Sequence, residues 1–153
     1  MRWGWLVTVL ILGVLLSGCT YFLSDVTKVD LRLVAGGDVN PDDSGRPSPV
    51  VVRILELKSP AVFETADFFA LYQDPEQTLG ADLVALEEVE FKPGDVRDFK
   101  LGLQPESGYV AIMAAYRRLE QANWRLVLPL RSGHKNAVTV LLNRRGVELA
   151  SPR

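Results

Sequence analysis

Two reactive residue types are almost missing from this 153-residue sequence, which has one cysteine, Cys19, and one histidine, His134. A single cysteine cannot form an internal disulfide, so an exported domain with this sequence must be stabilised by its hydrophobic core. A zinc site needs several thiolate or imidazole ligands and is excluded. His134 lies in a polar loop segment, RSGHK, with no acid or oxyanion-hole pattern beside it. The sequence therefore indicates no catalytic residue and no enzyme.

A large excess of charge and a complete metal motif are also absent. The chain has 17 basic and 19 acidic residues, and no basic stripe indicates a nucleic-acid partner. Asp38, Asn40 and Asp42 are spaced like the start of a calcium loop. The positions that should hold glycine and a bidentate glutamate are instead Asp43 and Pro49. No glycine-rich phosphate loop is found either, so we expect no metal, no cofactor and no small-molecule substrate.

The N-terminal segment has the layout of an export signal. Arg2 is the only charged residue before Asp25, and an apolar run over 3–16 is followed by small residues. A basic start, a short apolar run and small residues are typical of a signal peptide, here 1–18. A transmembrane anchor is the alternative, because the uncharged stretch 3–24 is long enough to span a bilayer.

The four residues that end the apolar run, LSGC, resemble the bacterial lipobox. The resemblance implies cleavage before Cys19, a diacylglycerol on its thiol and an acyl chain on the new amine. Several acyl chains would hold the protein on a membrane almost permanently, at about 0.8 kcal/mol per buried CH₂. Thr20 occupies the position at which an aspartate favours retention of such a lipoprotein in the inner membrane. The threonine therefore implies a location on the periplasmic face of the outer membrane. Residues 19–25 would form a lipidated tether.

Short apolar strands dominate the rest of the chain, 26–153. Segment 26–35 alternates apolar and charged residues, which is typical of a half-buried strand. Segment 50–57 is β-branched and apolar, which indicates a central strand, and segment 109–117 is almost entirely apolar and small, which indicates burial on both faces. Further strands are expected over 83–91, 96–103, 124–128, 138–142 and 147–150. Seven or eight strands with regular turns predict a mainly β fold, a two-sheet β-sandwich in one domain.

A small helical insertion of about 60–80 follows the second strand. Segment 60–73 has apolar residues near a period of 3.6, with Ser59 as a good N-cap, and a short turn is expected at 75–79. We expect the aromatic side chains of this region to pack against a sheet, as we do for the strand residue Trp124. These aromatic residues are Phe68, Phe69 and Tyr72.

The loop expected over 36–49 is unusual in length and composition. It has three glycines and three prolines in fourteen residues, which is longer than a connection between sandwich strands requires. Loops on a rigid scaffold often carry binding residues. The prolines restrict its backbone and favour shaped recognition over a flexible linker.

Two further arginine-containing segments have two interpretations. The run Tyr116-Arg117-Arg118 is either an exposed recognition patch or the end of a strand. The doublets 117–118 and 144–145 are most simply interpreted as solvated surface.

Several motifs together resemble the type VI secretion system lipoproteins of the TssJ/VasD family. The longest is the run VNPDDSGRPSPVVVRILEL over 39–57, followed by FETADFFALY over 63–72. The remaining motifs occur in the same order: Leu79-Gly80, Pro93-Gly94, Gly108-Tyr109-Val110, Ala115-Tyr116-Arg117-x-Leu119 and Trp124-Arg125. The resemblance runs from the lipobox nearly to the C-terminus.

This resemblance implies a transthyretin-like sandwich and a structural function. Such a lipoprotein is held in the outer membrane by its lipid and binds the periplasmic C-terminal part of TssM. It is linked indirectly to TssL in the envelope-spanning secretion complex. The loop between the first two strands is implicated in binding TssM, and the matching residues are Asn40, Pro41, Asp42, Gly45, Arg46 and Pro47. The alternatives are a periplasmic lipoprotein carrier or another envelope-binding module.

Overall fold

Two four-stranded sheets stack face to face in the computed structural model, which describes residues 26–151. The first sheet has the order β4-β1-β7-β8, with bounds Val96–Gly102, Lys28–Ala35, Lys135–Asn143 and Gly146–Leu149. The second has the order β3-β2-β5-β6, with bounds Leu83–Phe91, Val50–Leu57, Tyr109–Ala114 and Arg125–Val127. Strands β1 and β7 are parallel, and the other neighbours are antiparallel. The expected two-sheet β-sandwich is confirmed.

The alternating pattern of β1 explains the main core, which lies between the sheets. Val29, Leu31 and Leu33 point inward and are at most 1% exposed, whereas Arg32 faces solvent. Side chains of β2 and β5, including Ile112, pack against them from the second sheet. Burial of each such aliphatic side chain contributes about 1.5–3 kcal/mol, so the fold needs no disulfide.

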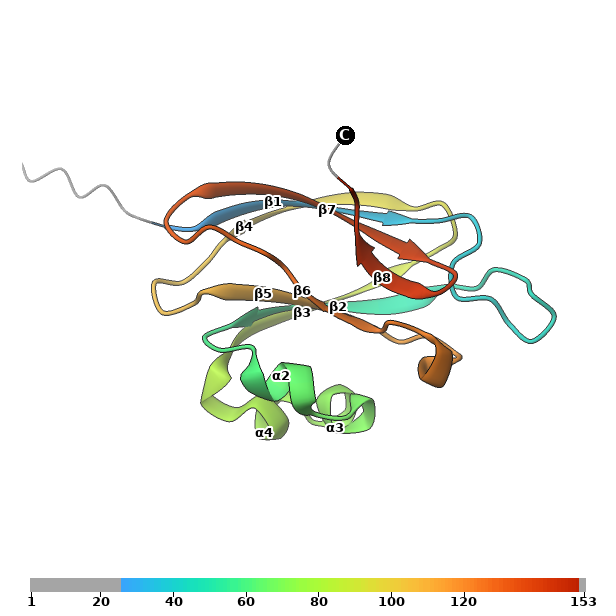
Figure 1. Ribbon diagram of the computed structural model, residues 1–153, viewed down its shortest axis with the longest axis horizontal. Helices are drawn as coiled ribbons and strands as arrows, with labels where there is room; N and C mark the ends of the chain where they lie inside the picture. Colours follow the sequence, from blue (N-terminus) through green and yellow to red (C-terminus); the bar gives the residue numbers. More distant parts are fainter. Residues whose placement is uncertain (1–25, 152–153) are drawn as a thin grey trace, which may run out of the picture.

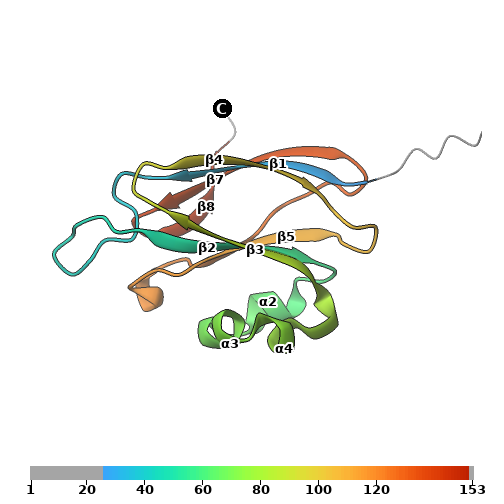
Figure 2. The same ribbon diagram turned by 180° about the vertical axis from the view of Figure 1, so that it is seen from behind.

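A helical layer covers the outer face of the second sheet (Figures 1 and 2). It consists of α2 (Ala61–Thr65), α3 (Phe68–Gln73), α4 (Pro75–Leu79) and the 3₁₀ turn η1 (Gly80–Asp82). Phe63 and Leu71 from this layer form a second core with Leu55, Leu57 and Met113 of the sheet. Strands β2 and β5 are therefore buried on both faces, as predicted for β5, and β2 is an inner strand of its sheet, as predicted from its β-branched sequence.

The single helix expected over 60–73 is wrong, because the chain breaks into two helices. Ala66 is extended, with φ −66° and ψ 151°, and ends α2. Asp67 then caps α3, its carboxylate accepting hydrogen bonds from two backbone N–H groups at 2.9 and 3.1 Å. Phe68 packs inward as expected, but Phe69 is 60% exposed, which corrects the expectation for that residue.

Two strand ends also differ from the sequence-based expectation. Strand β5 ends at Ala114 rather than 117, because the chain turns there through a 3.1 Å backbone hydrogen bond between residues 114 and 116. Strand β7 begins at Lys135, inside a segment expected to be a polar loop. Its parallel pairing with β1 starts at this residue and outweighs the local polarity.

The β1–β2 loop (36–49) projects from one end of the sandwich, and β1 begins at the opposite end (Figure 1). The β3–β4 and β7–β8 turns lie at the same end as this loop. Among residues 26–151, no helix is long and apolar enough to cross a membrane. The expected signal peptide, the lipidation site Cys19 and the tether 19–25 lie outside the described residues.

Candidate functional site

Asn40 fixes the base of the β1–β2 loop. Its φ of 47° lies in the left-handed region, which asparagine tolerates better than most residues. Its Nδ2 donates to the Pro49 carbonyl at 2.6 Å, which ties the two arms of the loop together. Its Oδ1 accepts from the Arg117 backbone N–H at 2.8 Å, which ties the loop to the segment after β5. With 3% of its surface exposed, Asn40 shapes the loop instead of presenting itself to a partner.

The stem of the loop packs on the end of the sandwich. Val39 is fully buried in the main core, and Pro41 is buried beside it. The Ser48 N–H donates to the Val39 carbonyl at 3.1 Å and closes the stem. Packing and hydrogen bonding of both arms favour a shaped loop over a flexible linker.

Asp42 organises the tip of the loop. The Asp42 N–H donates to the Arg46 carbonyl at 2.8 Å, and the Gly45 N–H donates to the Asp42 carbonyl at 2.9 Å. One carboxylate oxygen of Asp42 accepts from the backbone N–H groups of Ser44 and Arg46, and the other accepts from Arg46 Nε, all at 2.9 Å. These bonds, chiefly that from the Arg46 backbone N–H, hold the pKa of Asp42 below its usual value of 3.8. Gly45 supplies the φ of 78° that the turn needs.

The six loop residues predicted from the sequence therefore separate into two groups. Asn40, Pro41 and Asp42 hold the backbone in shape, and Gly45 makes the turn. Arg46 and Pro47 are exposed at the tip, and 79% of the Arg46 side chain is accessible to solvent. The tip can offer a partner a guanidinium, an apolar ring and the exposed backbone around them. Contact of these residues with a partner stays a prediction.

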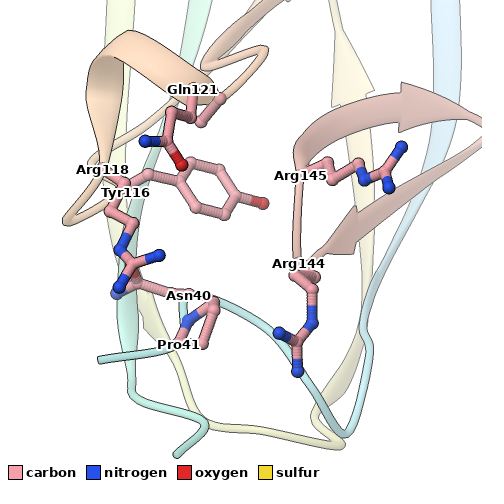
Figure 3. Close-up of a pocket in the computed structure, with 8 residues that line it drawn as sticks. Asn40, Pro41, Tyr116, Arg118, Gln121, Arg144 and Arg145 are labelled. Carbon is pink, nitrogen blue, oxygen red and sulfur yellow. The ribbon is translucent and has the colours of Figure 1, made fainter. Parts of the chain in front are cut away.

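A cleft of about 400 Å³ lies beside the loop stem, and the sequence did not indicate it (Figure 3). Its walls come from the stem, the segment after β5 and the β7–β8 turn. The polar side chains that line it are those of Asn40, Tyr116, Arg118, Gln121, Arg144 and Arg145. The run Tyr116-Arg117-Arg118 and the arginine doublet 144–145 contribute to it, but in the sequence they had equally simple interpretations as a strand end and as solvated surface.

The described residues give no support for metal or histidine chemistry. Within 26–151, no three His, Cys, Asp or Glu residues are grouped so that they could hold a metal ion. Asp42 is engaged within the loop, and Asp38 pairs with Arg144 at 3.6 Å. His134 is an exposed loop residue, as expected, and its Nδ1 lies 2.8 Å from the Ser132 carbonyl oxygen.

Solved structures with this architecture come from type VI secretion. The crystal structure of the T6SS lipoprotein TssJ1 from Pseudomonas aeruginosa superposes with a TM-score of 0.80 and 31% identity, over 84% of this chain and 98% of that one. Serratia marcescens Lip, a membrane-bound component of the type VI secretion system, gives a TM-score of 0.77 and 23% identity, over 83% and 99% of the two chains. A chain of the structure described as "Type VI membrane complex" gives 0.71 and 25%, over 81% and 98%.

Sequence comparison points to the same group of proteins. No curated protein matches the chain. The family described as "Type VI secretion lipoprotein, VasD, EvfM, TssJ, VC_A0113" matches residues 27–145, which include every strand except β8, the helical layer and the β1–β2 loop. The chain therefore belongs to the type VI secretion lipoprotein family that includes TssJ and VasD.

Proposed function

We propose that this protein is an outer-membrane lipoprotein that tethers a type VI secretion membrane complex. Its lipid would be carried by Cys19, and its β1–β2 loop would bind the periplasmic C-terminal part of TssM and, through it, link to TssL. The function is structural and requires no catalytic residue. Family membership and the resemblance of the loop sequence to that of TssJ/VasD proteins support the proposal.

The arrangement of the two ends is the observation that carries this proposal. Strand β1 begins at one end of the sandwich and leads directly into the β1–β2 loop at the other (Figure 1). The eight residues of β1 span roughly 26 Å. Cys19 precedes Val26 by seven residues, so at most about 25 Å of extended chain can separate the lipid from the sandwich. An anchor at the N-terminus would thus direct the loop away from the membrane surface.

The shape of the loop tip supports protein recognition. Its backbone is fixed by Asn40 and Asp42 before any partner arrives, so little conformational entropy would be lost on binding. A carrier of small apolar ligands is less well supported, because the inward-facing side chains of both sheets are used in packing the main core.

Titration of the full-length lipoprotein in detergent micelles with the periplasmic domain of its cognate TssM tests the proposal. The informative variant replaces the exposed tip, 43–47, with glycine and serine and retains the buried stem. The matched control replaces the exposed residues 104–106 at the other end of the sandwich. We expect tight binding that the tip variant loses and the control keeps. If the tip variant binds TssM as tightly as the native protein does, the interface lies elsewhere on the surface. If the native protein does not bind TssM, the proposed role in binding TssM is refuted.

A further inference from the structure

The cleft beside the β1–β2 loop contains a buried hydroxyl group without a partner. Tyr116 is 5% exposed, and its Oη has no hydrogen-bond partner among residues 26–151. Figure 3 shows the ring reaching from the segment after β5 into the cleft, with the hydroxyl directed towards the β7–β8 turn. A buried hydroxyl that makes no hydrogen bond is unfavourable, so a ligand group that displaces the atoms covering this hydroxyl and completes the bond would be stabilised there.

Arginine side chains line both walls of this cleft, and in Figure 3 the Arg145 guanidinium is directed away from the hydroxyl. Arg118 lies on the wall formed by the segment after β5, and Arg144 and Arg145 lie on the β7–β8 turn opposite (Figure 3). Arg118 and Arg144 form only exposed ion pairs with acids of the β1–β2 loop, Asp43 at 3.2 Å and Asp38 at 3.6 Å. Such exposed pairs are weak and leave both guanidinium groups able to bind a better-placed carboxylate.

The turn that carries two of these arginines is held rigidly. Asn123 N–H donates to the Arg145 carbonyl at 2.9 Å, and Val147 N–H donates to the Asn123 carbonyl at 2.7 Å. Gly146 lies between them with φ 134°, and a Cβ there would collide with the Asn123 backbone. The two walls of the cleft are therefore locked at one separation.

The hydroxyl of Tyr116 is also kept in the form that donates. Burial, with the nearby carboxylates of Asp38 and Glu148, raises the pKa of this phenol above its ordinary value of 10.0. It therefore remains protonated at physiological pH and can donate to a carboxylate.

We propose that this cleft receives a glutamate or aspartate side chain of the protein that docks on the β1–β2 loop, an inference that rests on the proposed binding function. Tyr116 Oη–H donates to one carboxylate oxygen, and Arg118 and Arg144 on the two walls donate to the other. The rim also carries Asp38, Asp43 and Glu148, which offset the arginines and weaken attraction for a free anion. A carboxylate held in place by an adjoining interface has a high effective concentration and does not depend on that attraction.

Two substitutions in the full-length lipoprotein test the site through its cognate TssM periplasmic domain. Tyr116→Phe removes only the hydroxyl, and we expect affinity to fall by about ten-fold or more, the effect of losing one hydrogen bond to a charged group. Because that hydroxyl has no partner in the free protein, the unfolding midpoint should stay the same or rise. A merely structural role for Tyr116 would lower stability and leave affinity unchanged.

Charge removal gives a second readout. The pair Arg144→Gln with Arg145→Gln should weaken binding and reduce its dependence on salt, whereas Arg131→Gln, an exposed arginine at the opposite end, should change neither. Suppose that the Tyr116 and Arg144/Arg145 variants bind TssM as the native protein does, and that the 43–47 tip variant does not bind it. This result would overturn the proposal that the cleft binds a carboxylate and would leave the proposed binding of TssM standing.

A small probe separates the cleft from the choice of partner. Because the acids at the rim weaken binding of a free anion, N-acetyl-glutamate methylamide is titrated to high millimolar concentration, where it should shift the nuclear magnetic resonance signals of Tyr116 and of the Arg145 and Gly146 amides, and the isosteric glutamine compound should not. If TssM fails to bind but the glutamate probe shifts these signals, the carboxylate site stands and its partner is another protein. If both probes leave the signals unchanged and TssM does not bind, the cleft proposal is wrong.

Discussion

At the scale of single residues, Asn40 has the largest expected effect on the loop. Asn40→Ala removes two buried hydrogen bonds and places alanine at a φ of 47°, so we expect a loss of about 1–3 kcal/mol in the free energy of unfolding. Denaturant unfolding followed by circular dichroism measures this loss. In Asn40→Gly, the glycine adopts the positive φ without strain and only the hydrogen bonds of the side chain are lost. The free energy of unfolding should therefore fall by less than in Asn40→Ala. Equal stability of the native and alanine proteins would contradict this role.

Asp42 gives the loop a defined response to acid. Its folded pKa lies below the unfolded value of 3.8, so the stability that it contributes is present above pH 3.8 and is lost as the pH falls through the folded pKa. We expect the Ser44 and Arg46 amide signals to stay unchanged from pH 7 to pH 5 and to move only in the acid range below. Asp42→Asn should abolish that movement, and a transition near pH 6 would require a different titrating group.

The sequence identified the loop but not the task of each residue in it. Glycine, proline and the NPD run are local signals, and they predicted the loop at 36–49 that the structure has between β1 and β2. Burial of Asn40 depends instead on its bond to Arg117, which is 77 residues away in the chain. The orphan hydroxyl of Tyr116 likewise follows from the meeting of three distant segments, so no local pattern could reveal the cleft.

At the scale of elements, two arginines hold the helical layer on the second sheet. Arg125 Nη1 donates to the Phe63 and Ala66 carbonyls at 2.9 and 2.7 Å, which satisfies acceptors at the end of α2. Arg53 Nη1 donates to the Tyr72 carbonyl at 2.7 Å near the end of α3. Positive charge at these two C-terminal helix ends also complements the helix dipoles.

Arg125→Met should therefore loosen the helical layer without disturbing the sandwich. We expect the free energy of unfolding to fall by about 1.5–3 kcal/mol, the value of hydrogen bonds that involve a charged group. Fluorescence of Trp124, the one tryptophan outside the first 25 residues, reports the change because Arg125 stacks on its ring at 4.3 Å. The control Arg32→Met removes an exposed pair with Asp98 and should change stability by less than about 0.5 kcal/mol. If Arg125→Met and Arg32→Met lower the free energy of unfolding equally, Arg125 does not hold the helical layer on the sheet.

Period and composition predicted the elements better than their ends. The burial of β5 on both faces, the inner position of β2 and the alternation of β1 were predicted directly from their apolar patterns. The break at Ala66 was missed, although Asp67 is a favourable N-cap residue, because the apolar period continues across it. The early start of β7 was missed because parallel pairing with β1 is a tertiary effect.

At the scale of the whole molecule, the sandwich separates the proposed anchor from the proposed interface. The N-terminal end of β1 and the β1–β2 loop lie at opposite ends of the long axis (Figures 1 and 2). The extended strand β1 connects these two ends, and it is hydrogen-bonded to β4 on one side and to β7 on the other. A pull on the loop would therefore be shared among three paired strands before it reached the anchor.

The proposed tethering function requires a lipid that stays in the membrane, and Cys19, outside the described residues, is the residue proposed to carry it. Cys19→Ser removes the thiol that would be alkylated, so we expect an uncleaved or periplasmic protein and loss of type VI secretion. Membrane fractionation and an assay of type VI secretion measure the two effects. Thr20→Asp is the matched variant, since it keeps the lipid but is expected to retain the protein in the inner membrane. Loss of secretion in both variants would show that outer-membrane location matters, whereas secretion by the Thr20→Asp protein would mean that any membrane anchor suffices. Normal secretion by Cys19→Ser would contradict the tethering function itself.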